Sequence, residues 1–213
     1  MAIFNMVQGK VPMTYRGVKT KLLAHFDNAA NLAETAVYMN SGGAQSAFLN
    51  RSSVDLNGKF SSGVSLISAT FDNLVPIGKT PFTIEFWLKP YSSNNNLCYV
   101  GFGESPSNDY LFAINYVNIL IITSGYKVIS PNLQTNTYTH VAIVGNGAAD
   151  GTRSISALVN GVNIETKQYD YIFMNKKFFI VNSGFFNIDE LRISNVARYA
   201  ANFTPPTAPF APD

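Results

Sequence analysis

Thirteen acidic residues, two histidines and one cysteine are the side chains of this 213-residue chain that could support acid–base, nucleophilic or metal chemistry. A retaining glycosidase needs two carboxylates roughly 5 to 5.5 Å apart, and one strand supplies them when both acids share a face. Asp189 and Glu190 are adjacent, so a regular strand would point them to opposite faces. No other acidic pair has a same-face spacing within one predicted strand. Glycoside hydrolysis would therefore need a pair from two different strands.

The remaining reactive side chains also lack the spacing that catalysis or metal binding requires. The sequence has no Gly-x-Ser-x-Gly elbow for a serine nucleophile and no Gly-rich phosphate loop. His25, His140 and Cys98 lie far apart in the sequence, unlike the ligands of a zinc site. Each histidine is predicted to be a hydrogen-bonded core or edge residue, and Cys98 a small buried hydrophobe. We therefore expect a protein that is not an enzyme.

Composition excludes several classes of partner. The chain is 46% hydrophobic and 13% charged, which is enough for one substantial core. A net charge of +2 is too small to recruit nucleic acid or an anionic membrane. The most apolar long segment, 111–123, is interrupted by two asparagines and is too short to span a bilayer. The first residues lack the basic lead of a secretion signal, so we expect assembly in a cytoplasm.

Two loops combine aromatic, amide and hydroxyl side chains, which can stack on a sugar ring and hydrogen bond to its hydroxyl groups. The candidate carbohydrate-binding residues are Tyr91, Asn94, Asn95 and Asn96 in the first loop and Asn108 and Tyr110 in the second. Asn-rich loops also occur because Asn forms turns readily, so both interpretations remain open. Trp87, the sole tryptophan, is expected to pack in the core.

Strand patterns dominate from residue 21 onward. In 82–89 apolar and polar residues alternate, which predicts a strand with one buried face. Further strands are predicted over 22–27, 97–103, 110–115, 117–124, 138–144, 154–159, 162–167 and 184–194. Asn160-Gly161 is a strong hairpin signal, and the frame slips at Asp189-Glu190, as a bulge would cause. Residues 29–53 are ambiguous, with a candidate helical turn over 32–38. Many short strands with almost no helical pattern predict a sandwich or barrel.

Four segments resemble laminin-G-like, concanavalin A-like lectin domains. They are Phe82-Thr83-Ile84-Glu85-Phe86-Trp87, then Thr139-His140-Val141-Ala142 with Asn146-Gly147, then Leu158-Val159-Asn160-Gly161, and the closing strand 184–194. Tyr138 stands where the family usually has Trp, and we expect it to keep an aromatic ring in the core. The resemblance implies an all-β fold, an antiparallel β-sandwich of the concanavalin A-like jelly-roll type. The sandwich would occupy 21–203, after a basic N-terminal arm (1–20) and before a Pro-rich C-terminal tail (204–213).

The ending of the chain resembles a narrower group. Asn195-Val196-Ala197-Arg198-Tyr199 and Asn202-Phe203-Thr204-Pro205-Pro206 are most similar to versions found in tailed-bacteriophage virion proteins. This resemblance implies a multicopy virion surface protein, of the capsid-decoration or head-fibre type, with weak multivalent glycan adhesion. The arm, with Lys10, Arg16 and Lys19, and the tail would contact other virion subunits. The alternatives are a dedicated carbohydrate-binding lectin module and a tail-associated adhesin.

The resemblance also implies one cofactor. Related lectin domains often hold a structural calcium ion near the first and last strands, and Asp27 and Asp189 match the acidic positions there. Calcium takes six to eight oxygen ligands, so carbonyl groups and water would have to complete the site. The alternative is that Asp27 caps a turn and that Asp189 is a surface or bulge residue.

Overall fold

The computed structural model describes residues 20–26, 37–39, 47–71, 80–91, 97–103, 112–115, 118–123, 126–129, 133–147, 153–168, 177–211 and 213. Within these residues every regular element is a β-strand, and every strand pairing is antiparallel. The predicted all-β antiparallel fold is confirmed. In the part of the chain that is described, no helix is long and apolar enough to cross a membrane.

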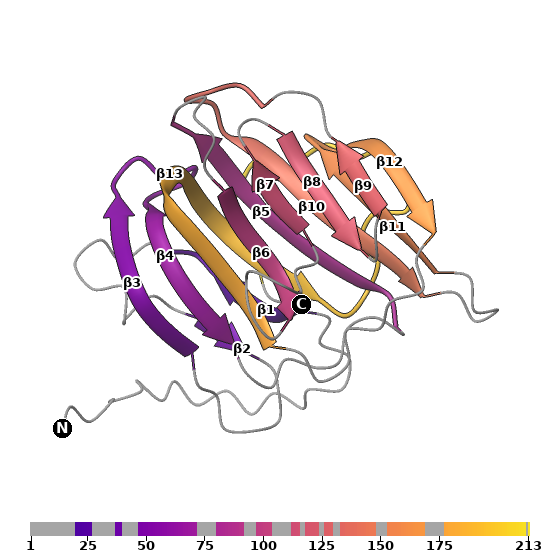
Figure 1. The fold of residues 1–213 in the computed structure, drawn as a ribbon, viewed down its shortest axis with the longest axis horizontal. Helices are drawn as coiled ribbons and strands as arrows, with labels where there is room; N and C mark the ends of the chain where they lie inside the picture. Colours follow the sequence, from indigo (N-terminus) through magenta and orange to yellow (C-terminus); the bar gives the residue numbers. More distant parts are fainter. Residues whose placement is uncertain are drawn as a thin grey trace.

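The strands form two layers that share β13 (Lys177–Ser194), as Figure 1 shows. One layer has the order β12-β11-β10-β5-β13-β1-β2, with β12 Val162–Gln168, β11 Arg153–Val159, β10 Thr139–Gly147, β5 Phe82–Pro90, β1 Thr20–Ala24 and β2 Val37–Met39. The other has the order β9-β8-β7-β6-β13-β4-β3, with β9 Tyr126–Ile129, β8 Asn118–Thr123, β7 Phe112–Asn115, β6 Leu97–Gly103, β4 Gly63–Phe71 and β3 Ala47–Asp55.

The long strand β13 passes from one layer to the other. Its first part, 177–183, pairs with β6 and β4, and its last part, 186–194, pairs with β5 and β1. The register against β5 shifts between Asp189 and Arg192, and Glu190 has a φ of 56°. Strands that change layer do so at bulges and bends, so the bulge that the frame slip predicts is confirmed and lies close to this transition.

The strand β5 is buried on both faces, although its sequence alternates apolar with polar residues. Phe82, Ile84, Phe86 and Leu88 are each 0% exposed, and so are Thr83 and Glu85 on the other face. The apolar set faces the interior between the two layers. The polar set faces outward, where the chain that follows β13 covers it.

That covering chain is the C-terminal segment, residues 195–211. Ala197, Tyr199 and Phe203 pack against Ala142, Val144 and Leu158 of the sheet. Farther along the segment, Phe210 is 4% exposed and joins Trp87 and Leu23 in a second apolar cluster. Burying a phenylalanine side chain stabilises a fold by about 1.5–3 kcal/mol. The Pro-rich tail therefore packs on its own domain through Phe210, a contact that the predicted role in binding other subunits does not include.

The hairpin between β11 and β12 also holds this segment. Asn160 and Gly161 have φ angles of 48° and 77°, as a two-residue type I′ turn requires, so the predicted hairpin is confirmed. Phe203 N–H donates to the Gly161 carbonyl at 2.9 Å. A Cβ atom at Gly161 would lie 1.9 Å from the Phe203 carbonyl oxygen, so the turn needs glycine for space as well as for φ.

The remaining predicted strands appear, 97–103 matches β6, and most boundaries change by three residues or fewer. The closing strand is the exception, because β13 begins at Lys177, seven residues before the predicted start. The pattern did not predict β4 or β9, and it left β2 and β3 within the ambiguous stretch 29–53. Of the candidate helical turn, residues 37 and 38 belong to β2, and 32–36 lie outside the described residues. The strands β2 and β9 have only three and four residues, too few for a clear alternation. The strands β3 and β4 are longer, but their pairing has two register shifts that break the period of two.

Candidate functional site

A group of half-buried aromatic and lysine side chains lies where β5 ends. It comprises Lys89 and Tyr91 at the end of β5, Tyr138 just before β10, and Asn57, Lys59 and Phe60 in the loop between β3 and β4, and we call it the aromatic–lysine patch. Asn57 is exposed and the other five residues are half-buried. The loop 133–138 is joined to the end of β5 because Asn136 N–H donates to the Pro90 carbonyl at 2.6 Å.

The ammonium group of Lys89 is held at the centre of the patch. Its Nζ atom lies 5.2 Å from the ring centroid of Tyr91 and 4.9 Å from that of Tyr138. It also donates a 3.0 Å hydrogen bond to the carbonyl of Asn57, which accepts a second bond of 2.8 Å from the Tyr138 hydroxyl. Cations within about 6 Å of an aromatic ring are attracted to its face. Lys89 therefore has a defined position, and it ties together three separate segments of the chain.

The second lysine, Lys59, lies above Trp87. Its Nζ atom is 4.3 Å from the Trp87 ring centroid and 5.8 Å from that of Phe60. The Phe60 and Trp87 rings meet edge to face, with centroids 6.0 Å apart. Trp87 is 5% exposed, so the prediction that it packs in the core is confirmed, although it does so on the outward face of β5, beneath Lys59.

The buried carboxylate of Asp189 positions this loop. Asp189 is 0% exposed, and its Oδ2 atom accepts hydrogen bonds from the backbone N–H groups of Lys59 at 2.7 Å and Phe60 at 3.3 Å. The loop itself turns tightly, since Gly58 N–H donates to the Ser61 carbonyl at 3.1 Å. As the alternative to calcium binding, the sequence offered a surface position or a bulge position for Asp189. The structure places Asp189 at the bulge, where it is buried.

The proposed calcium site is only partly covered by the structure. Asp27 lies outside the described residues, so its pairing with Asp189 stays a prediction. At Asp189 the Oδ2 atom accepts two backbone N–H groups, so this oxygen is occupied by the loop 59–60. Among the residues that the structure describes, no group of three or more His, Cys, Asp or Glu could hold a metal ion.

One of the six predicted carbohydrate-binding residues can be placed. Tyr91 is half-buried within the aromatic–lysine patch, and its N–H donates to the Phe185 carbonyl at 2.9 Å. The other five, Asn94, Asn95, Asn96, Asn108 and Tyr110, lie outside the described residues. The sequence does not reveal that Tyr91 shares Lys89 with Tyr138, because the family resemblance implies a core position for Tyr138. The spacing of Lys89 and Tyr91, two residues apart on one strand face, was the available signal.

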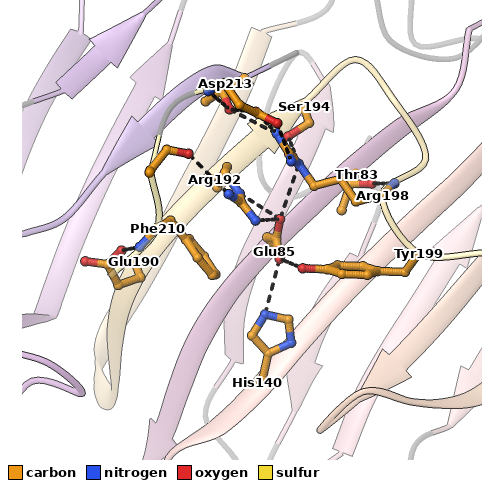
Figure 2. Close-up of polar contacts among 12 residues, drawn as sticks. Thr83, Glu85, His140, Glu190, Arg192, Ser194, Arg198, Tyr199, Phe210 and Asp213 are labelled. Carbon is orange, nitrogen blue, oxygen red and sulfur yellow. Dashed lines mark hydrogen bonds and ion pairs between the residues drawn. The ribbon is translucent and has the colours of Figure 1, made fainter. Parts of the chain in front are cut away.

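A second polar cluster lies under the C-terminal segment and centres on Glu85, as Figure 2 shows. Arg192 donates to Glu85 Oε1 from Nε at 2.8 Å, and its Nη2 atom is 2.8 Å from the same oxygen. The Tyr199 hydroxyl donates to Oε2 at 2.7 Å, and His140 Nε2 lies 3.3 Å from that oxygen. Burial raises the pKa of Glu85, but His140, Arg192 and Tyr199 outweigh this and hold the pKa below its usual range.

The pKa of the Tyr199 hydroxyl is raised, first by burial and then by the neighbouring Glu85 carboxylate. Both carboxylate oxygens of Glu85 are therefore occupied, and Glu85 and His140 are each 0% exposed. A general acid or base must reach the proton that it transfers. In this arrangement the C-terminal segment separates both groups from any substrate, and the cluster serves to hold that segment.

The end of the segment is fixed by Arg198. The guanidinium group donates to Ser194 Oγ at 2.6 Å, to Thr20 Oγ1 at 3.0 Å and to the Asp213 carboxylate, at 3.1 Å from Nη1 (Figure 2). Thr20 N–H in turn donates to the Asp213 carbonyl at 3.1 Å. The hydrogen bond from Arg198 lowers the pKa of Asp213 to about 2. The start of β1 and residue 213 therefore meet at one point on the domain.

A further contact with the C-terminal segment involves His25 and Glu190, which lie side by side next to Phe210. His25 Nδ1 is 2.6 Å from Glu190 Oε1, and Glu190 Oε2 accepts a 2.6 Å hydrogen bond from the Phe210 backbone N–H. Glu190 is 0% exposed, whereas the His25 side chain is 25% exposed. The prediction of a hydrogen-bonded edge residue is confirmed for His25. His140 has the predicted core position, but its ring nitrogens make no regular hydrogen bond, and Nε2 lies 3.3 Å from Glu85. Glu190 therefore also anchors the C-terminal segment.

The fold has relatives among solved structures. The binding domain of botulinum neurotoxin serotype D/C is 15% identical, with a TM-score of 0.57 over 84% of this chain and 49% of that chain. A protein of the Shiga toxin-encoding bacteriophage phi24B, described as a carbohydrate esterase, is 13% identical, with a TM-score of 0.56 over 84% of this chain and 100% of that chain. Trypanosoma rangeli sialidase is 10% identical, with a TM-score of 0.56 over 84% of this chain and 31% of that chain.

At these identities the structural similarity shows the fold alone. The chain spans about half the length of the neurotoxin binding domains that it matches, 48% for the complex with SialylT. No curated protein sequence is significantly similar to this chain. Residues 57–202, which are more than half of the sequence, match a described family. The chain belongs to the Laminin_G_3 family of the concanavalin A-like lectin/glucanases superfamily.

Proposed function

We propose that this chain is a non-enzymatic carbohydrate-adhesion module, displayed in many copies on the surface of a bacteriophage virion. The observation that carries the adhesion is the aromatic–lysine patch. It combines aromatic rings with hydrogen-bonding groups on rigid strand ends, which is the chemistry that binds sugar rings and hydroxyl groups. Structural relatives with glycan ligands in their descriptions, such as the neurotoxin domain bound to SialylT, support the proposal at the level of the fold.

The position of the patch suits a displayed module. Thr20 and Asp213 meet near the start of β5, where Thr83 Oγ1 accepts from Arg198 N–H at 3.0 Å and Arg198 binds both residues. Tyr91 lies at the other end of the same strand, eight residues from Thr83, or about 27 Å at the usual rise per residue. The predicted basic arm joins the domain at Thr20. A module attached through this arm would present the patch at its opposite end.

The virion assignment is supported by resemblance. The segment 195–206 resembles tailed-phage virion proteins in sequence, and the protein of phage phi24B shares the fold over its whole length. The location that we propose on the particle is a capsid-decoration or head-fibre position, with assembly in the host cytoplasm. We propose no esterase activity for this chain. Of its described acid–histidine pairs, Glu85 and His140 are buried under the C-terminal segment, and Glu190, the partner of His25, is bound to that segment.

The proposal is tested on a glycan array with the intact protein displayed on multivalent beads, so that weak binding is detected through avidity. Tyr91→Ala and Tyr138→Ala should each reduce the signal, because each removes one of the rings beside Lys89. Lys167→Gln on the exposed strand β12 serves as the matched control. The absence of any specific glycan, or binding that both tyrosine variants retain, would overturn the proposed site.

Two further measurements address the wider proposal. Antibody labelling of purified particles should place the protein on the virion, and its absence from the particles would favour the alternative of a dedicated lectin module. Repeating the array in calcium and in chelator tests the predicted calcium ion. Unchanged binding and an unchanged melting temperature in the two buffers would remove calcium from the proposal.

A further inference from the structure

We infer that the aromatic–lysine patch selects sugars that carry a carboxylate over neutral sugars of the same shape. This inference rests on the proposed function and adds the chemical class of the ligand. Two ammonium groups that are held in place, and the burial of the acidic residues of β5 and β13, support it.

The Lys89 ammonium is already positioned before any ligand arrives. The Asn57 carbonyl and the faces of Tyr91 and Tyr138 fix its location at the centre of the patch. A flexible lysine would lose side-chain entropy on binding an anion, which reduces the gain from a surface ion pair. Here most of that entropy is lost on folding, so a carboxylate meets a charge that needs little reorganisation.

The second ammonium, Lys59, adds to the positive field. It lies above the Trp87 ring, and no ion pair joins it to any acidic side chain that the structure describes. Its backbone is fixed because Lys59 N–H donates to the buried Asp189 carboxylate. Lys59 belongs to the same loop as Asn57, whose carbonyl holds Lys89, so the two ammonium groups of the patch come from adjoining segments.

Among the described residues, the acidic side chains of the neighbouring strands β5 and β13 are buried and bound to other groups. Asp189 is buried with Oδ2 bonded to backbone N–H groups, Glu190 is buried against His25 and Phe210, and Glu85 is buried against Arg192 and Tyr199. None of the six residues of the patch is itself acidic. With only two lysines, the patch is too small for a polyanion such as nucleic acid, whose binding needs many phosphate contacts. A carboxylate on a sugar ring matches both the charge and the aromatic surface.

The test compares matched acidic and neutral sugars on the intact protein. The pairs are 3′-sialyllactose with lactose, tri-galacturonate with its methyl ester, and a glucuronate disaccharide with its carboxyl-reduced form, each titrated and followed by NMR chemical shifts. For at least one pair the acidic member should bind about three- to tenfold more tightly in 20 mM salt, as two partly exposed ion pairs would produce. This preference should shrink in 300 mM salt, because exposed charges are then screened.

Variants locate the effect. Lys59→Gln and Lys89→Gln should each weaken the acidic sugar about two- to fivefold more than they weaken its neutral partner, so that the ratio of the two Kd values falls toward one. Lys89→Arg should retain the preference, since it keeps the charge, and Lys167→Gln should have no effect. Tyr91→Ala should weaken both members of the pair. Circular dichroism and thermal melting confirm that every variant is folded.

The outcomes separate this inference from the proposed function. Equal binding of acidic and neutral sugars that Tyr91→Ala abolishes would overturn the carboxylate preference and leave the adhesion module standing. A preference that survives in the Lys59→Gln/Lys89→Gln double variant would also overturn the inference, because other groups would then recognise the acid. Binding of other glycans on the array through Tyr91, with no binding of any of these pairs, would overturn the carboxylate preference alone. An array without any specific glycan would overturn the proposed function itself.

Discussion

The Tyr199 hydroxyl donates a 2.7 Å hydrogen bond to Glu85, across a sequence separation of 114 residues. Glu85 lies in the middle of β5, and Tyr199 lies in the C-terminal segment beyond the last strand. This contact explains how a strand with a polar outward face can be buried on both sides. The C-terminal segment supplies partners for the polar groups and apolar side chains for the rest of the face.

Replacing Tyr199 with Phe should lower the free energy of unfolding by about 1.5–3 kcal/mol, the usual range for a hydrogen bond to a charged group. The ring would stay in place, so the change reports the hydroxyl alone. Urea denaturation measures the loss, and the same substitution in a Glu85→Gln background should cost less. Equal losses in the two backgrounds would show that the hydroxyl does not stabilise the carboxylate.

Replacing Phe210 with Ala should destabilise the domain by about 3–5 kcal/mol, as expected for a buried phenylalanine. Phe210 contacts Trp87 and Leu23, and the Arg192 guanidinium lies 4.2 Å from its ring centroid. Thr207→Ala is the matched control, because Thr207 is an exposed residue of the same segment and should change stability by no more than about 0.5 kcal/mol. If both variants melt like the wild type, the segment does not contribute to the fold.

The pair of Arg198 and Asp213 should stabilise the protein at neutral pH and lose this effect in acid. The pKa of Asp213 falls from 3.8 to about 2 in the folded chain, mainly because Arg198 donates a hydrogen bond to its carboxylate. The unfolded chain therefore takes up the proton first as the pH falls. The stabilisation is present above about pH 4 and is lost as the pH approaches 2.

Asp213→Asn removes this titration and provides the test. Stability measured by urea denaturation from pH 6 to pH 2 should fall less steeply below pH 4 in the variant than in the wild type. Glu85, whose pKa is also lowered, remains in both proteins and contributes acid sensitivity to each of them. Identical pH profiles would mean that the Arg198–Asp213 contact has no energetic weight.

Gly161→Ala should destabilise the domain by more than about 1 kcal/mol, because a left-handed residue with a Cβ atom is strained. The added atom would also lie 1.9 Å from the Phe203 carbonyl oxygen and disturb the C-terminal segment. Asn160→Asp is the control, since aspartate tolerates a positive φ and keeps an acceptor for the His140 N–H, 3.0 Å away. Differential scanning calorimetry measures the melting temperature of both variants, which should fall for Gly161→Ala and not for Asn160→Asp. A wild-type melting temperature for Gly161→Ala would contradict the prediction.

Much of the fold follows from short-range patterns in the sequence. The alternation over 82–88, the hairpin at Asn160-Gly161 and the slip at Asp189-Glu190 each depend on a few neighbouring residues, and each appears in the structure. Strand period and turn chemistry are local properties, so a single sequence reveals them. The class of fold and the family follow from the order of these elements.

The position of the candidate site could be predicted only in part. Tyr91 was identified by composition, but its neighbours Lys59 and Tyr138 come from segments far away in the sequence. Asp189 offered two interpretations, and only the tertiary structure showed a buried carboxylate that accepts backbone N–H groups of the loop. Contacts between distant segments leave no local pattern in the sequence.

The sequence by itself determined the strands, the hairpin and the sandwich class, because backbone sterics and hydrophobic period act over neighbouring residues. Only the tertiary structure decided that the polar face of β5 is buried, since an alternating strand with Thr83, Glu85 and Trp87 on one side is typical of a solvent-exposed face. Burial of that face becomes favourable when Arg192, Tyr199 and His140 provide partners for Glu85. Those partners come from three different parts of the chain, and folding is what brings them together.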